Sequence, residues 1–422
     1  MRWLKIILVA LLLSAKSFCS FGQLTIEQCY ESARENYPLI QQYGLINLSE
    51  QYDLANVSKA YLPQFSLSSK ATYQTDVTSV PISIPGYDIP TLAKDQYQIL
   101  AEVSQSIWDG GVTRANREAI RAQSEVERSQ FEVNMYGIKE RINNLFFGIL
   151  LLDQQISLSD IYLADLEVNY LRTVSYMDNG VVNQSDVDAV RVEQLTAGQN
   201  RTQLISNRTA YINMLSAFIG LPLDEQTRLE KPQVFTRPGT AEAVNRPEMA
   251  LYDAQRSQFN AQRFAVKASN MPQFGVFVQG GYGKPGLNMF DDKFKAFAIG
   301  GVRLSWNFGN YYTRRNNLMK IDNGIRSVEV QRETFLFNND LQQTQLRSQY
   351  DKYRQIMADD DEIIRMRSNI VRASEAKLEN GTISVTDLMR DMLAEQNAKV
   401  NKAVHEIEVI QTAYEIKNLT NE

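Results

Sequence analysis

The chain has 422 residues, of which 44% are hydrophobic and 22% are charged, proportions that exclude an intrinsically disordered protein. Its 44 basic and 49 acidic residues give a formal charge of −5 and form no basic stripe, which argues against nucleic acid as a partner.

Residues 1–22 have the pattern of a secretory signal peptide. Arg2 and Lys5 precede an apolar core at Ile6–Ala15, which is too short to cross a bilayer, and small residues follow. Cleavage after this segment leaves Cys29 as the only cysteine, so no disulfide within the chain is expected. No later stretch approaches eighteen consecutive apolar residues, so an exported chain that enters a membrane is expected to do so as strands.

Residues 23–222 are predicted to form a first structural repeat. Helical spacing of apolar residues extends from Gln23 to Lys59, and two alternating stretches follow at about 64–75 and 96–108. The alternation of apolar and polar residues, with aromatic residues at the ends, is typical of strands between lipid and a water-filled lumen. A soluble sheet with one wet face is the alternative.

A long helical hairpin completes this repeat. Residues 112–178 contain no proline, which predicts one long helix, and a tip at 179–183 leads into a return helix that ends near Ile219. Residues 223–240 contain Pro232 and Pro238 and are predicted to link the two halves.

Residues 241–422 are predicted to form a second repeat in the same order. After a helix, two strands are expected at about 273–283 and 294–308. A helix of about seventy residues then reaches a tip at 380–384, and a final helix follows.

The two halves share a register, which indicates a tandem duplication. The apolar residues of one helical seam recur 201 positions later, and the Asn-Gly turn after each seam keeps the same offset: Ile156, Leu163, Tyr170 and Met177 correspond to Met357, Ile364, Val371 and Leu378. Four strands per chain cannot close a barrel, because about eight is the smallest number with room for side chains. If these strands lie in a membrane, several copies must therefore share one barrel, with twelve strands in a homotrimer or eight in a homodimer.

The ordered set of motifs resembles the TolC-like outer-membrane efflux proteins. It comprises Asn36-Tyr37-Pro38-Leu39 and Asn245-Arg246-Pro247-Glu248 in the first helices, Leu62-Pro63-Gln64-Phe65 before a strand and Ile107-Trp108-Asp109-Gly110-Gly111 after one. The resemblance implies a mainly α chain with membrane β: duplicated helix-strand-strand-helix units that form a periplasmic α-helical barrel and a shared 12-stranded outer-membrane β-barrel in a homotrimer. It further implies an exit duct of a tripartite efflux or type I secretion system, which contacts outer-membrane lipid, a periplasmic adaptor (membrane fusion protein) and an inner-membrane pump.

The resemblance also implies roles for particular residues. The tips that contact the adaptor correspond to Asn179, Gly180, Val181, Asn380, Gly381, Thr382 and Ile383, and the periplasmic entrance to Asp186, Asp387 and Asp391. Residues at the barrel-to-helix junctions are Pro63, Trp108, Gly110, Gly111, Pro272, Trp306 and Gly309. A local structural explanation competes with the first two roles, because a glycine commonly ends a helix and an aspartate favours a helix start.

Nothing in the sequence indicates an enzyme, and no cofactor or metal is expected. Residues 359–362 and His405, the only histidine, are both expected on solvated helix faces. The alternative to a channel is an exported, non-conducting coiled-coil scaffold or adhesin, which would not need two alternating hairpins of membrane-crossing length.

Overall fold

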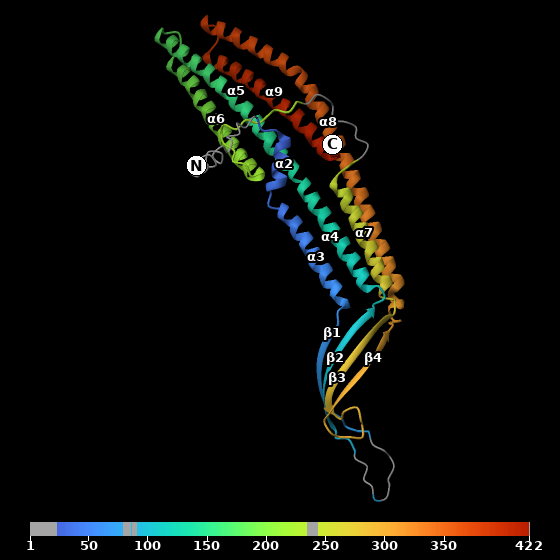
Figure 1. The fold of residues 1–422 in the computed structure, drawn as a ribbon. Coiled ribbons are helices and arrows are strands. Elements are labelled where there is room, and N and C mark those ends of the chain that lie inside the picture. The colour runs from blue at the N-terminus through green and yellow to red at the C-terminus, as the bar shows by residue number, and fades with distance from the viewer. Residues whose placement is uncertain (1–22, 79–85, 87–90, 234–243, 422) are drawn as a thin grey trace, which may run out of the picture. The chain divides into compact units, whose positions relative to one another are not determined.

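The computed structural model describes residues 23–78, 86, 91–233 and 244–421; the predicted signal peptide and residues 234–240 of the predicted linker lie outside them. The elements follow one another as helices, a strand pair and a helical hairpin, twice (Figure 1). In chain order they are α2 (Ile26–Asn36), α3 (Ile40–Ser58), the short 3₁₀ helix η1 (Lys59–Tyr61), β1 (Gln64–Tyr73), β2 (Asp95–Trp108), α4 (Val112–Tyr136), α5 (Ile138–Asp178), α6 (Gln184–Ile219), α7 (Pro247–Ala268), β3 (Gln273–Lys284), β4 (Lys295–Ser305), α8 (Asn310–Glu379) and α9 (Val385–Thr420).

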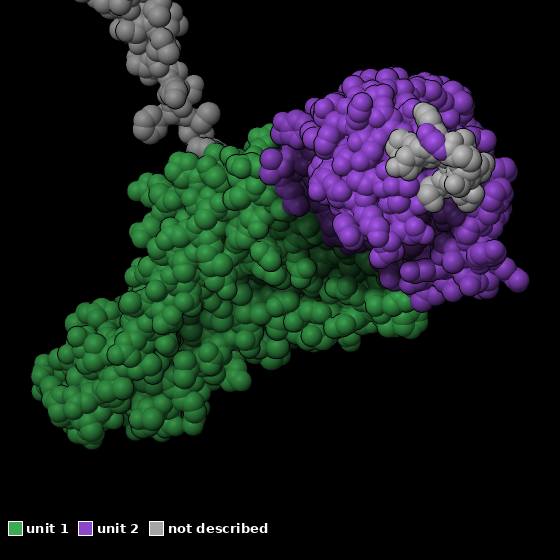
Figure 2. Space-filling view, turned by 90° about the horizontal axis from the view of Figure 1, so that it is seen from below, with its two compact units in different colours: residues 1–41, 132–247, 334–422 green, residues 42–131, 248–333 purple. Residues whose placement is uncertain are grey.

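The chain divides into two compact units that interleave in sequence (Figure 2). Unit 1 comprises residues 1–41, 132–247 and 334–422, and unit 2 comprises residues 42–131 and 248–333. Each unit therefore takes segments from both predicted repeats. None of the described helices combines the length and the apolar character that crossing a bilayer requires.

The long helix predicted over residues 112–178 is interrupted. α4 ends at Tyr136 and α5 begins at Ile138, with Gly137 between them. Glycine lowers helix stability by about 0.5 to 1 kcal/mol relative to alanine, which favours a break at this position, although Gly148 within α5 causes none. No such break occurs in α8, which is one helix of 70 residues although it contains Gly324.

The four strands of unit 2 form one antiparallel sheet in the order β1-β2-β3-β4. The two hairpins lie next to each other because β2 pairs with β3 along nearly its full length, from Tyr97 opposite Lys284 to Ser106 opposite Gly275. β1 and β4 each have one neighbour and are the edges of the sheet (Figure 1). All four strands are long enough to cross a bilayer, which needs about 9 to 11 tilted residues.

Unit 1 is held together by the apolar faces of its long helices. α5 packs against both α6 and α9, and Phe146, Phe147 and Ile149 on α5 are fully buried. Each such side chain contributes roughly 2 kcal/mol through burial. On α8 the predicted seam faces the core at Val371 and Leu378, which are also buried.

Candidate functional site: a two-faced sheet and two helix tips

One face of the sheet is apolar and exposed. The strand register places Phe65, Val103 and Val278 in one row across β1, β2 and β3, and their exposed fractions are 71%, 43% and 62%. At the edges, Leu67 on β1 and Val302 on β4 are 67% and 68% exposed. Natural soluble proteins rarely leave so continuous an apolar surface uncovered, so this face is built to contact something apolar.

A bulge extends the apolar face to the end of β2. The register shifts between Ser106 and Trp108, so that Ile107 is the extra residue and Trp108 lies opposite Phe274. A bulge adds one residue to one strand and thereby reverses which face the next side chain joins. Trp108 therefore lies on the same face as Phe274, at the boundary where aromatic residues gather in membrane strands.

The opposite face carries a connected set of polar side chains. Gln279 Nε2 donates to Glu102 Oε2 at 2.5 Å, and Arg303 Nη1 donates to the other oxygen of Glu102 at 3.3 Å. The Arg303 guanidinium also lies 4.7 Å from the centre of the Phe277 ring. Three strands thus share one network on the polar face, which suits a surface that lines water.

Two phenylalanine rings on the polar face lie over glycines of the neighbouring strand. Phe297 is opposite Gly281, where a Cβ would come within 2.2 Å of the ring, and Phe277 is opposite Gly301. The absence of a side chain at each glycine lets the ring lie flat on the backbone, a pairing that pins strand register.

The sequence-predicted junction residues lie where the strands meet the helices. Gly110 and Gly111 both have positive φ, 70° and 88°, and a Cβ on Gly110 would lie 2.8 Å from Met271 Cβ. Asp109 begins α4 by accepting hydrogen bonds from the amides of Gly111 and Thr113 at 2.9 and 2.6 Å. The chain can turn from strand to helix here only with glycine at both positions.

The remaining junction residues frame the other strand ends. Pro63 and Pro272 immediately precede β1 and β3, where a missing amide costs no ladder hydrogen bond. Trp306 Nε1 donates to the carbonyl of Asn270 at 3.0 Å, and the Gly309 amide donates to an asparagine side chain just before it.

The first helix tip has a Schellman motif at the end of α5. Asp178 is the last residue of α5, Asn179 is its C-cap, and Gly180 adopts φ 75°. The Gly180 amide donates to the Met177 carbonyl at 2.9 Å, and the Val181 amide donates to the Tyr176 carbonyl at 2.8 Å. These two bonds satisfy carbonyls that the helix end leaves free.

The second tip repeats this motif 201 residues later. Gly381 has φ 66°, its amide donates to the Leu378 carbonyl at 2.9 Å, and the Thr382 amide donates to the Lys377 carbonyl at 2.9 Å. Asn179 and Asn380 each donate from the side chain to a carbonyl four residues earlier, both at 2.7 Å. The two tips are therefore locally the same structure, and their backbones are exposed.

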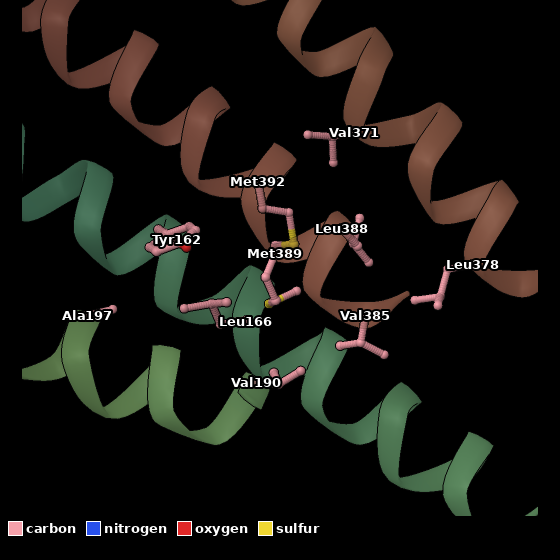
Figure 3. Close-up of a cluster of buried hydrophobic side chains, with 10 residues drawn as sticks. All are labelled: Tyr162, Leu166, Val190, Ala197, Val371, Leu378, Val385, Leu388, Met389 and Met392. Carbon is pink, nitrogen blue, oxygen red and sulfur yellow. The ribbon is translucent and has the colours of Figure 1, made fainter. Parts of the chain in front are cut away.

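A core cluster lies directly behind the tips (Figure 3). It joins Leu166 of α5, Val190 of α6, Leu378 of α8 and Leu388 of α9, which are at most 4% exposed. Val182 and Ile383, which are equivalent positions of the two tips, pack against this cluster. Ile383 is thus half-buried, whereas Val181 is 55% exposed and free to contact a partner.

Comparisons with known proteins identify the architecture. A scan of protein-family models and a sequence search of curated proteins find no match. Among solved structures, the Campylobacter jejuni CmeC outer membrane channel matches 94% of this chain and 85% of its own at 11% identity, with a TM-score of 0.67. The outer membrane protein VceC from Vibrio cholerae matches 94% of both chains at 11% identity, with a TM-score of 0.65. The open state of the Neisseria gonorrhoeae MtrE outer membrane channel matches 94% of this chain and 88% of its own at 13% identity, with a TM-score of 0.66.

The chain has the TolC-like outer-membrane channel fold. The predicted mainly helical architecture with four antiparallel strands, in repeated helix-strand-strand-helix order, is confirmed.

In this TolC-like fold, the predicted entrance aspartates Asp186 and Asp387 are helix caps. Each forms a capping box with the residue three before it, Asn183 for α6 and Ser384 for α9. Hydrogen bonds from the Ser384 hydroxyl and amide, together with the nearby Arg390, hold the pKa of Asp387 below its ordinary value of 3.8. The Asp387 carboxylate is therefore charged at neutral pH. Both side chains accept a hydrogen bond from the backbone amide of their own N-cap residue.

Asp391 has a different environment. It accepts a hydrogen bond from Ser374 Oγ at 2.6 Å, which joins α9 to α8, and its side chain is 17% exposed. Arg390 lies between the two carboxylates, 3.4 Å from Asp387 and 3.8 Å from Asp391. The structure therefore brings Asp387 and Asp391 to one arginine, and Asp186 remains apart in α6.

His405 and Asp360 correct a sequence-based expectation. The solvated positions predicted for them are wrong: His405 Nδ1 lies 2.8 Å from Asp360 Oδ2, and the two side chains are 20% and 6% exposed. The pair joins α8 to α9. Sequence inspection missed it because the two residues are 45 positions apart and each sits among charged neighbours.

Arg208 of α6 was also missed. Its side chain is 6% exposed, pairs with Asp153 of α5, and donates to the carbonyls of Glu225 and Thr227 at 2.9 Å each. It fastens the beginning of the predicted linker to the helical hairpin. Among the residues described, no group of three or more metal-ligating side chains comes together.

Proposed function

We propose that the chain is the outer-membrane exit duct of a tripartite efflux or type I secretion system, a passive channel whose helices lie in the periplasm. The observation that carries this proposal is the two-faced sheet. One face is apolar and exposed from Phe65 to Val302, and the opposite face carries a polar network around Glu102. Such strands fit between lipid and a water-filled lumen. CmeC, VceC and MtrE, which share the fold, are outer-membrane proteins.

The sheet edges support a homotrimer. β1 and β4 each have a free edge, and lipid does not tolerate unpaired backbone groups. One sheet of four strands is too small to close on itself. When β1 of one copy pairs with β4 of the next, three copies make a barrel of twelve strands with no free edge.

The repeat register supports the same assembly in the helical part. In α5, Tyr162 and Asn169 are buried, and Asn169 Nδ2 donates to Met392 Sδ of α9 at 3.4 Å. The residues 201 positions later on α8, Ile363 and Ile370, are 45% and 43% exposed. The repeat equivalent of α9 is α6, so α6 of a neighbouring copy is the helix that would cover them.

The helix tips are proposed to dock a periplasmic adaptor, and through it an inner-membrane pump. Both tips expose the same backbone motif, and Val181 and Thr382 occupy equivalent positions at their ends. A partner with repeated sites would contact the two tips in the same way. Asp387 and Asp391 are proposed to line the entrance that the tips surround.

Two measurements test this function. The oligomer, extracted with detergent from outer membranes, should insert into planar bilayers and conduct ions in discrete steps. Site-directed cross-linkers at Val181 and Thr382 should capture one periplasmic protein in vivo, whereas a linker at the buried Leu388 should not. A detergent-free, soluble monomer without conductance would instead indicate a scaffold or adhesin.

A further inference from the structure

The two ends of the sheet differ in charge. At the helical end, the ten residues next to each strand are 54–63, 109–118, 263–272 and 306–315. Together these four segments contain seven basic and two acidic residues, a net charge of +5 in a chain whose total is −5. We name the seven basic residues the basic collar: Lys59, Arg114, Arg117, Arg263, Lys267, Arg314 and Arg315. The two loops at the other end, residues 74–94 and 285–294, carry two basic and four acidic residues, a net charge of −2.

Two lysines at the strand ends next to these loops have local partners. Lys284, the last residue of β3, lies 3.4 Å from Asp292 and 3.8 Å from Asp95. Lys295 pairs with Asp291. The charges of these two lysines are therefore compensated within the chain.

The two acidic residues at the helical end already have hydrogen-bond or ion-pair partners. Asp109 accepts hydrogen bonds from two backbone amides at the start of α4, and Glu118 pairs with Arg121 at 3.3 Å. Within the described residues, Arg114 and Lys267 have no carboxylate within ion-pair distance. Lys267 lies 5.8 Å from the centre of the Phe264 ring, which leaves its charge uncompensated.

Arg114 and Lys267 line a common groove in unit 2. A cavity of about 730 Å³ lies between α4 and α7. Its lining includes Gly110, two residues after the end of β2. Phe264 and Met271 also line it, and they are 59% and 49% exposed. Glu118, Arg121 and Glu125 line the groove as well. Glu118 pairs with Arg121, and Glu125 pairs with Arg128. The groove thus combines an apolar wall with two cations, Arg114 and Lys267, that have no carboxylate partner among the described residues.

We propose that this groove binds an anionic phospholipid of the periplasmic leaflet, with the headgroup phosphate at Arg114 and Lys267. The other members of the basic collar face neighbouring headgroups, apart from Arg263, which pairs with Asp322. The inference rests on the proposed membrane location. Trp108 and Trp306, at the same end of the sheet, are placed at the level where tryptophans meet headgroups. Near an anionic surface each basic residue strengthens binding about fivefold.

Tryptophan quenching by brominated lipids tests the site directly. The intact oligomer is reconstituted in phosphatidylcholine vesicles with brominated phosphatidylglycerol or, at the same mole fraction, brominated phosphatidylcholine. Trp108 and Trp306 report on lipid at the collar, since the third tryptophan, Trp3, lies in the predicted signal peptide. We expect stronger quenching by phosphatidylglycerol, and an excess that rising salt reduces.

Variants locate the preference. Arg114→Gln with Lys267→Gln should lower the preference for phosphatidylglycerol at least about fivefold. Arg114→Lys with Lys267→Arg retains both charges and should retain the preference. Arg365→Gln, in the other compact unit, serves as the control for loss of an exposed arginine.

Three outcomes would overturn the proposal: equal quenching by the two lipids in the parent, an undiminished preference in the double glutamine variant, or displacement of the lipid by inorganic phosphate, which would assign the groove to a free anion. A parent that conducts in bilayers but shows equal quenching removes the lipid site and leaves the channel intact. A parent that does not enter vesicles removes both.

Discussion

The repeat register makes a quantitative prediction about assembly. Ile363 and Ile370 on α8 are 45% and 43% exposed, whereas their counterparts on α5 are buried. Complete burial of an isoleucine is worth about 1.5 to 3 kcal/mol, so covering the exposed part contributes about 1 kcal/mol per residue. Two residues in each of three interfaces give about 6 kcal/mol for a closed trimer, or about four decades in its association constant.

Replacement of both isoleucines by serine tests this value. The assay is the temperature at which the purified oligomer dissociates on a denaturing gel, together with the monomer fraction in detergent by native mass spectrometry. We expect a lower dissociation temperature for the double variant and more monomer. Arg365→Ser, on the same helix and paired with the neighbouring Glu362, should leave both unchanged. A double variant as stable as the parent would refute the inference that a neighbouring copy covers this face.

Three further predictions concern single sites. Gly220→Ala should destabilise unit 1 more than Gly180→Ala does. Both glycines have positive φ, which costs alanine about 1 to 2 kcal/mol, but only at Gly220 would the added Cβ lie 2.7 Å from another side chain. Equal losses in thermal stability would contradict the packing at Gly220. The stabilisation of α9 by the Asp387 cap should be complete at any pH above the ordinary pKa of 3.8 and should be lost as the pH falls through the lowered pKa of this carboxyl. Hydrogen exchange at the start of α9 should show this loss in the parent. If the same pH-dependent loss occurs in Asp387→Asn, another group causes it. His405→Ala leaves the buried Asp360 carboxylate without its partner and should lower the free energy of unfolding by about 2 to 3 kcal/mol. A second change, Asp360→Ala, should restore part of this loss. Additive losses in the double-mutant cycle would show that the pair is not coupled.

The features that the sequence predicted are those with a local signal. Alternation marks the strands, because their two faces meet different surroundings, and β1 begins at Gln64 immediately after the predicted break at Pro63. Each tip requires a left-handed residue and a capping side chain within a few positions, so Gly180 and Asp186 could be recognised without any tertiary information.

The features that the sequence did not reveal depend on residues far apart in the chain. Asp360 is buried only because α9 brings His405 against it, and nothing in the acidic run around it distinguishes this carboxylate from its exposed neighbours. Arg208 depends in the same way on linker carbonyls. The interruption at Gly137 was ambiguous for another reason, since Gly324 in α8 causes no break.

Cross-linking of the sheet edges tests the central claim most directly. One cysteine at Ser68 on β1 is combined with a second cysteine placed in turn along β4, and the outer-membrane protein is oxidised. If copies join edge to edge in a closed barrel, at least one register should give a covalent ladder of monomer, dimer and trimer that stops at the trimer. No cross-link at any register, or a ladder that continues past three, would contradict the account.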